Sequence, residues 1–273
     1  MSSISDASLA AIVSMFQGET GVQFSEGKKY LLTARLSPLL RRHHLETYEA
    51  FIDALKIKSP IGLWEEFIDA LTTHETSFFR DRKPFETISK VLLPDLVKRN
   101  VPAVNAWCPA CSTGQEAYSL AICMHQALGP AWNYRIKVNA SDVSHEPIAY
   151  AKRALYTDVE ISRGISPEIQ NLYLKKTSEG WAVRGDIRAC CRFLQENLLK
   201  LTPSASKYDL ILCRNVAIYF SPEDRKRMFT SLAERLVPGG VLITGTAEDA
   251  SQYNSAFTRF SHHTSLYYQL KTH

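Results

Sequence analysis

Residues 107–120 read WCPACSTGQEAYSL, and the fold of the chain follows from this stretch. The apolar run 101–107 is short enough for a buried strand, and 118–128 has the spacing of a helix packed on a sheet. The small residues between them include Gly114, which can adopt a positive φ and let the backbone approach a ligand. A strand, a tight turn and a helix N-terminus predict a site for a nucleotide-like ligand at the carboxyl edge of a sheet. An ordinary strand-to-helix turn is the alternative.

The composition is that of an ordinary globular protein. Of 273 residues, 45% are hydrophobic and 22% are charged, and this length suits two domains. A formal net charge of +4 is too small to indicate nucleic-acid binding. The N-terminus does not resemble a signal peptide, and no apolar run approaches the roughly 20 residues of a membrane span. We therefore expect a cytoplasmic protein with no nucleic-acid partner and no membrane insertion.

The cysteines do not form a recognisable metal site. Cys108 and Cys111 form a CxxC motif, but no second pair follows at zinc-ligand spacing. The other cysteines lie mostly in apolar segments, where a reduced thiol behaves as a small hydrophobic side chain. We therefore expect no metal, and a redox or metal-binding pair is the less favoured interpretation.

The first 75 residues predict an all-helical domain. Helix-forming segments cover residues 4–16, about 24–40, 47–55 and 61–71, and Gly18 is expected to end the first of them. A small bundle of helices follows from this pattern.

The second of these segments is cationic. It carries positive residues with no acidic residue among them, namely Lys28, Lys29, Arg35, Arg41 and Arg42. This pattern is typical of a solvated face, and it fits equally well a surface that attracts an acidic partner. On the second interpretation, Arg35, Arg41 and Arg42 would dock the partner.

Residues 76–100 are predicted to form a hinge and a linker helix, and residues 101–273 then alternate strands and helices. This alternation is typical of an α/β domain with a parallel sheet covered on both faces. The segment from about 157 to 193 has the character of a small inserted β subdomain. Residues 265–270 are predicted to be the last strand, antiparallel at the edge of the sheet.

Polar residues follow the predicted strands at the edge where such sheets bind ligands. Asp142 ends the second strand, where a carboxylate can accept hydrogen bonds from both ribose hydroxyls; capping the next helix is the alternative. Arg214 and Asn215 follow another predicted strand and belong to the same crevice. The first turn is not GxGxxG, and Glu116 would repel a pyrophosphate but attract an ammonium group. A nicotinamide-dependent oxidoreductase is therefore disfavoured.

Five motifs, in the right order along the chain, resemble those of the CheR family of chemotaxis receptor methyltransferases. They are 72–80 (TTHETSFFR), 110–119 (ACSTGQEAYS), 140–142 (ASD), 197–199 (NLL) and 213–220 (CRNVAIYF). The resemblance implies a Rossmann-like class I methyltransferase sheet, an N-terminal all-helical domain and a small inserted β subdomain. It implies S-adenosylmethionine as methyl donor and S-adenosylhomocysteine as product. The acceptors would be glutamate side chains on the cytoplasmic helical bundle of chemotaxis receptors, and the enzyme would be a monomer.

The resemblance also implies roles for individual residues. Glu116 would hold the methionine ammonium group and Asp142 the ribose hydroxyls, with Asn197 and Leu198 beside the adenine. Tyr219 would orient the incoming carboxylate, and with Arg80 it is the candidate for catalysis. The other residues expected to bind the cofactor are His74, Thr76 and Arg80 in the hinge, and Arg214 and Asn215 along the crevice.

The chain departs from the family pattern in several places. His74 replaces an Asn, while Gln115 and Ala117 replace Glu and Pro. The segment 175–180 is short compared with relatives that grip a C-terminal receptor pentapeptide, which favours an enzyme independent of that pentapeptide. Because of His74, a non-catalytic scaffold or sensor that binds S-adenosylmethionine on the same fold is the alternative function.

Overall fold

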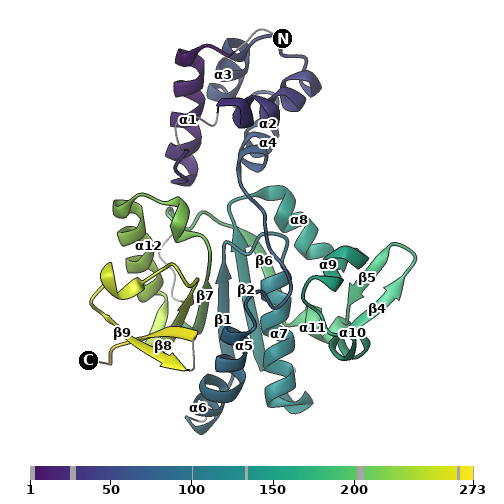
Figure 1. Ribbon diagram of the computed structural model, residues 1–273, viewed down its shortest axis with the longest axis vertical. Helices are drawn as coiled ribbons and strands as arrows, with labels where there is room; N and C mark the ends of the chain where they lie inside the picture. The colour runs from purple at the N-terminus through teal and green to yellow at the C-terminus, as the bar shows by residue number, and fades with distance from the viewer. Residues whose placement is uncertain are drawn as a thin grey trace.

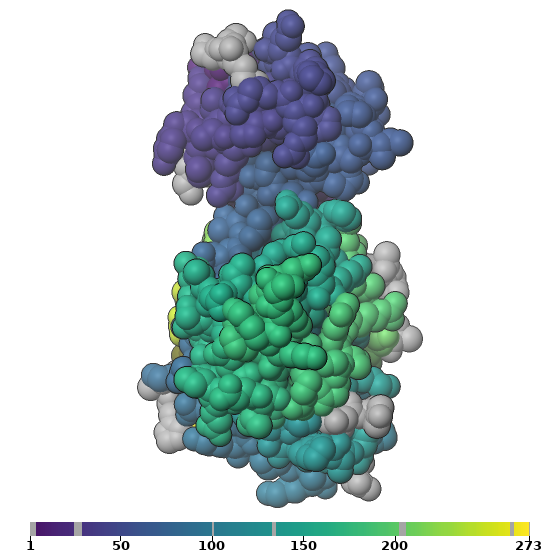
Figure 2. Space-filling view, turned by 90° about the vertical axis from the view of Figure 1, so that its right-hand side faces the viewer, coloured from purple at the N-terminus to yellow at the C-terminus, as the bar shows by residue number. Residues whose placement is uncertain are grey.

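The computed structural model describes residues 4–24, 29–99, 101–132, 135–201, 206–262 and 265–272. Its helical domain stands above a larger α/β domain (Figure 1), and a constriction separates the two in the space-filling view of Figure 2. The helices of the upper domain are α1 (Asp6–Thr20), α2 (Lys29–Arg42), α3 (Tyr48–Lys56) and α4 (Leu63–Leu71).

Aromatic side chains form the centre of the helical domain. Phe67 of α4 packs edge-on against Phe16 of α1 and Phe51 of α3, with ring centroids 6.1 and 5.9 Å apart. All three rings are fully buried. Burial of such a ring contributes about 1.5–3 kcal/mol, which gives this small bundle a core of its own.

Helix α1 ends later than predicted, because Gly21 and not Gly18 terminates it. Gly21 adopts a φ of 73° and donates its N–H to the carbonyl of Gln17, whereas Gly18 lies inside the helix. A Cβ on Gly21 would lie 2.1 Å from Leu199 Cδ1 in the larger domain. This glycine therefore ends the helix and also lets it approach the neighbouring domain.

The larger domain is built on a seven-stranded sheet with the order β6-β2-β1-β7-β8-β10-β9. The first five strands in this order run parallel, and the chain reverses its direction across the sheet between β1 and β7. Ligands bind at such a switch point, beyond the carboxyl ends of the strands. The strand bounds are β1 (Val104–Pro109), β2 (Ile136–Asp142), β6 (Cys191–Gln195), β7 (Tyr208–Cys213), β8 (Leu236–Thr244), β9 (Phe257–His262) and β10 (Ser265–Leu270).

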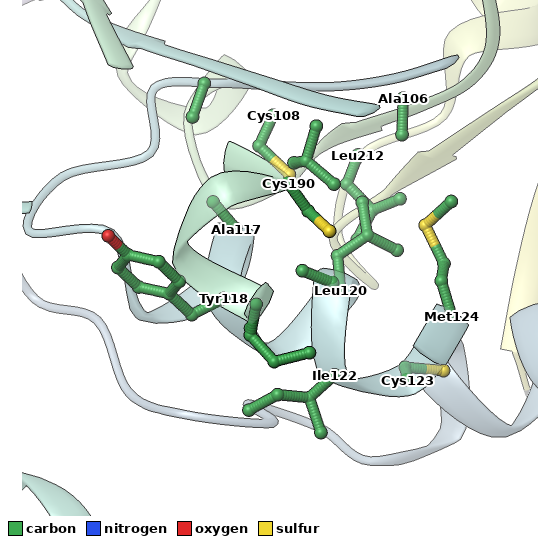
Figure 3. Packing of buried hydrophobic residues seen from close by; sticks show 14 of the residues in the cluster. Ala106, Cys108, Ala117, Tyr118, Leu120, Ile122, Cys123, Met124, Cys190 and Leu212 are labelled. Atoms are coloured by element: carbon green, nitrogen blue, oxygen red, sulfur yellow. The ribbon is translucent and has the colours of Figure 1, made fainter. Parts of the chain in front are cut away.

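Helices cover both faces of this sheet, as the alternating pattern predicted. Ala106 and Cys108 of β1 pack in one buried cluster with α7 (Figure 3), whereas Trp107 belongs to a second cluster with α12. Successive side chains of a strand point to opposite faces, so β1 contributes to both cores. The covering helices and the linker are α5 (Lys83–Thr87), the π-helical η1 (Ile88–Leu92), α6 (Leu93–Lys98), α7 (Gln115–Leu128), α8 (His145–Arg153) and α12 (Pro222–Glu234).

The prediction for the sheet edge is wrong. Strand β10 is antiparallel as expected, but it lies between β8 and a strand that the sequence analysis missed, β9. Strand β9 alternates poorly in hydrophobicity, since most of its side chains are exposed at the true edge. The sequence of β9 therefore lacks the alternating pattern by which a strand is predicted.

A three-stranded antiparallel sheet, in the order β3-β5-β4, projects beside α9 and α10 (Figure 1). Its first strand precedes the segment that the sequence predicted to be inserted. Its strands are β3 (Leu155–Tyr156), β4 (Leu174–Thr177) and β5 (Gly180–Val183). The remaining helices are α9 (Asp158–Ser162), α10 (Pro167–Tyr173), α11 (Gly185–Ala189), η2 (Pro130–Trp132), η3 (Ala217–Tyr219) and η4 (Ala250–Gln252). No helix in the described ranges is long and apolar enough to cross a membrane.

Candidate active site

A cleft of about 1230 Å³, including its open mouth, lies at the carboxyl ends of β1, β2, β6 and β7. The neck, residues 72–80 between the two domains, and the end of α1 contribute the residues of its other wall. The structure brings together in this cleft every residue proposed for cofactor binding or catalysis. They are His74, Thr76, Arg80, Glu116, Asp142, Asn197, Leu198, Arg214, Asn215 and Tyr219.

The turn after β1 has the geometry that its small residues predicted. Gly114 adopts a φ of 93° as the N-cap of α7. A Cβ at this position would lie 2.7 Å from the Cβ of Ala151, so that both the backbone conformation and the space require glycine. Ser112, with a φ of 50°, donates its hydroxyl to the carbonyl of His74 at 3.0 Å and thereby joins the turn to the hinge.

Asp142 is buried at the end of β2 and is held by the backbone. Its Oδ2 accepts the N–H of Ser112 at 2.8 Å, and its Oδ1 accepts that of Ser144 at 3.0 Å. Burial raises the pKa of Asp142, and the two N–H groups oppose this rise. Each oxygen has a second lone pair with which to bind a ligand hydroxyl.

Asp142 does not cap helix α8, which was the alternative to ribose binding. The N-cap residue is Ser144, and the carboxylate of Asp69 in α4 accepts the N–H groups of His145 and Glu146, both at 2.9 Å. A carboxylate from the helical domain therefore occupies the N-terminus of α8, where the helix dipole favours negative charge. These two hydrogen bonds also join α4 of the helical domain to α8 beside the cleft.

Glu116 forms an ion pair that the sequence did not predict. Arg214 donates to Glu116 Oε2 at 2.5 Å and to Asp81 Oδ2 at 2.8 Å, and only 1% of its side chain is exposed. Burial raises the pKa of Glu116, while the charges of Arg214 and Arg80 lower it. Because the pair uses Oε2, a ligand ammonium group can bind at Oε1.

The loop after β7 is held by a residue that the sequence analysis missed. Glu248, in the turn after β8, accepts the N–H groups of Asn215, Val216 and Ala217 at 2.7–2.9 Å. The sequence did hold a signal for Glu248. An acidic residue shortly after β8 lies at the same edge of the sheet as Asp142, the last residue of β2.

The helical domain contributes to the cleft directly, which no sequence signal indicated. Thr20 and Val22 line it. Val22 forms an antiparallel bridge with Phe220, and Gln23 donates its N–H to the carbonyl of Tyr219 at 2.7 Å. The end of α1 and the loop after β7 therefore form one continuous wall.

Two of the predicted residues also have partners within the protein. Asn197 donates its side-chain amide to the carbonyl of Glu19 at 2.6 Å, so it joins β6 to the end of α1. His74 Nε2 lies 3.0 Å from Thr72 Oγ1 and 3.2 Å from the carbonyl of Asp69. Both residues line the cleft, and Asn197 also connects the two domains.

The cations proposed for docking differ in their partners within the protein. Arg35 donates to the carbonyls of Leu71 and Thr72, at 3.0 and 3.1 Å, and so caps the end of α4. Arg42 pairs with Glu66 at 2.7 Å, whereas Arg41 is exposed and has no ion pair within the described ranges. Lys28 lies outside the described residues.

The sheet order, the antiparallel strand pair at one end and the cleft at the switch point define the α/β fold of a class I methyltransferase. Sequence models agree: the CheR methyltransferase SAM-binding domain matches residues 74–266, and the CheR all-α domain matches residues 7–72. The chain therefore belongs to the CheR methyltransferase family, and S-adenosylmethionine (SAM) is its cofactor.

Known relatives resemble the chain over most of their length. A chemotaxis protein methyltransferase of Vibrio anguillarum is 29% identical over 271 residues, which are 98% of this chain and 98% of the relative. Chemotaxis protein methyltransferase 1 of Pseudomonas aeruginosa is 34% identical over 234 residues, covering 84% and 85%. Among solved structures, the magnesium protoporphyrin IX methyltransferase of Synechocystis PCC 6803 with bound SAM is 16% identical, with a TM-score of 0.39 and coverage of 81% and 97%.

Proposed function

We propose that this SAM-dependent methyltransferase transfers a methyl group to glutamate side chains of chemotaxis receptors, for sensory adaptation. The products are glutamyl methyl esters and S-adenosylhomocysteine. The observation that carries the proposal is one cleft to which each of the five family motifs contributes residues, in a chain of the CheR family. The names of the relatives, chemotaxis protein methyltransferases, support the receptors as the source of the acceptor.

The residues of the cleft fit the cofactor chemically. Asp142 has free lone pairs for two ribose hydroxyls, and Glu116 Oε1 accepts the ammonium group of the methionine. Arg80 stands at the same end, where its charge lowers the pKa of Glu116, and it suits the methionine carboxylate. Leu198 gives an apolar surface for the adenine, beside Asn197.

Methyl transfer to a carboxylate requires alignment of the two reactants more than acid–base catalysis. An exposed Glu has a pKa of about 4.3 and is ionised at neutral pH, so no general base is needed. Bound SAM supplies an electrophilic methyl group on a good leaving group. The protein then has to align two reactants and exclude water, an effect worth up to about 7–11 kcal/mol in ideal cases. Tyr219, 36% exposed at the mouth of the cleft, is placed to orient the acceptor carboxylate.

The acceptor assignment can be tested with methyl-labelled SAM and cytoplasmic fragments of chemotaxis receptors. We expect base-labile label on the fragments, because glutamyl methyl esters hydrolyse in base, and no label on fragments whose acceptor glutamates are alanine. Cofactor binding without any label would favour the alternative of a scaffold or sensor. We propose further that the enzyme acts as a cytoplasmic monomer on the helical bundle of the receptors.

A further inference from the structure

Glu248 is a buried carboxylate whose charge is met by backbone N–H groups. Oε2 accepts the N–H of Asn215 at 2.9 Å and that of Gly245 at 2.7 Å. Oε1 accepts the N–H of Val216 at 2.9 Å and that of Ala217 at 2.7 Å. Only 6% of Glu248 is exposed, and it does not line the cleft. Its hydrogen bonds therefore act on this loop and on its own turn, and it does not contact the cofactor directly.

The loop that Glu248 holds contains one residue in a left-handed backbone conformation. Asn215 adopts a φ of 58°, a left-handed conformation that costs free energy for a residue with a side chain. The N–H groups that Glu248 binds belong to a segment between β7 and the short helix η3. The same loop turns Arg214 and Asn215 into the cleft and leads to Tyr219.

Glu248 is itself fixed by the end of the neighbouring strand. Its carbonyl accepts the hydroxyls of Thr244, at 2.7 Å, and of Tyr268, at 3.2 Å. A Cβ on Gly245 would lie 2.7 Å from Glu248 Oε2 and 3.0 Å from Asn215 Nδ2. Because β7 and β8 pair directly, the turn after β8 is a rigid support for the loop after β7.

We propose that Glu248 is a positioning residue for methyl transfer. Through the N–H groups of residues 215–217 it holds the loop in the conformation that keeps Arg214 and Asn215 along the cleft and places Tyr219 to orient the acceptor. Rate depends steeply on such alignment, so a loosened loop slows transfer even when the cofactor is bound. The proposal rests on the methyltransferase activity and on receptor fragments as acceptors.

Asp209 provides a matched control for a purely structural role. It is also a buried acid, 8% exposed, and it lies on β7. Its Oδ2 accepts the N–H of Asn105 at 2.8 Å, at the end of the sheet opposite the cleft. Its replacement removes a buried carboxylate bonded to backbone without touching the loop.

The test compares Glu248→Gln with Asp209→Asn in single-turnover methylation at saturating SAM. The carboxylate of Glu248 accepts hydrogen bonds at both oxygens, whereas a glutamine amide has one oxygen and one NH₂ group. The NH₂ group cannot accept from the backbone N–H groups that it faces, so the loop loses part of its support. We expect at least a tenfold lower rate per folded molecule in Glu248→Gln, with faster hydrogen exchange at residues 214–217. The Asp209→Asn variant should keep the wild-type rate even if its Tm falls. A wild-type rate in Glu248→Gln, or an equal loss in both variants, overturns the proposal.

A second pair of variants serves if Glu248→Gln does not fold. Gly245→Ala pushes a methyl group against the carboxylate, and Gly185→Ala adds one where no atom lies within 4 Å. Only the first should slow transfer. If the wild-type protein fails to label receptor fragments, the acceptor assignment falls. The role of Glu248 is then tested by hydrogen exchange with S-adenosylhomocysteine bound. If exchange at residues 214–217 in Glu248→Gln or Gly245→Ala is the same as in wild type, the proposal is overturned.

Discussion

The cleft brings together charged side chains from segments far apart in the chain and buries Asp142 and Arg214, whereas the cations of α2 are half-buried or exposed. Arg214 is 1% exposed in its side chain and bonds to acids from two other segments. Arg42 is 67% exposed in its side chain and forms one surface pair. Exposed pairs contribute about 0–1 kcal/mol, while breaking a buried pair costs about 3–5 kcal/mol. Substitutions in the cleft should therefore have far larger effects than substitutions on α2.

The largest effect is expected for Asp142→Ala. The change removes a carboxylate that binds two backbone N–H groups and, by our assignment, two ribose hydroxyls. Hydrogen bonds to charged groups contribute about 1.5–3 kcal/mol each, so the Kd for S-adenosylhomocysteine should rise by about two orders of magnitude. Calorimetry measures this directly, with Asp209→Asn as the control. An unchanged Kd would refute the ribose assignment.

Arg35→Ala should have the next largest effect, on stability. The change removes the guanidinium group that donates to the carbonyls of Leu71 and Thr72, at the end of α4. We expect a loss of about 1–3 kcal/mol in the free energy of unfolding of the helical domain, measured by urea titration. Arg41→Ala, on the same helix, is the control and should change it little. Equal effects would mean that Arg35 is a surface cation like its neighbour.

Cofactor binding should weaken as the pH falls. Burial raises the pKa of Asp142 above 3.8, and protonation below that raised pKa removes an acceptor for the ribose. Affinity should therefore drop by at most about tenfold per pH unit in that range, with proton release on binding at the raised pKa. Calorimetry at a series of pH values measures it. The same trend in Asp142→Asn would assign the titration to another group.

The stability of the free protein should follow the opposite sign. The folded chain holds the proton of Asp142 more tightly than the unfolded chain, whose carboxyl has its ordinary pKa. The contribution of Asp142 to stability is therefore present below pH 3.8 and is lost as the pH rises through the raised pKa. Thermal unfolding of wild type and Asp142→Asn over this range separates that contribution from the rest.

The smallest effect is expected for the double variant Arg41→Ala, Arg42→Ala. Its receptor methylation should slow by about two- to fivefold at low ionic strength and approach wild type at high salt, because exposed charges are screened. The Kd for S-adenosylhomocysteine should not change. If the double variant methylates receptor at the wild-type rate at low salt, α2 is not part of the docking surface. The functional charges of the two regions would then lie in the cleft alone.

Much of the cleft could be predicted because one rule covers it. Asp142, Glu116 and Arg214 each follow a strand of a parallel sheet, and the carboxyl ends of such strands meet. Glu248 obeys the same rule and was missed, since the turn after β8 lacks a recognised motif. Strand β9 was missed because its exposed side chains have no alternating pattern.

The amino-acid order by itself determined the alternation of strands and helices, the edge at which ligands bind and the family. Only the tertiary structure decided which charges meet. Arg214 bonds to Glu116 and Asp81, and Arg35 caps α4, because packing brings these groups within hydrogen-bond distance. Local pattern encodes the conformation of a segment, but the partner of a buried charge lies on another segment, and its choice depends on how the segments of a domain pack together.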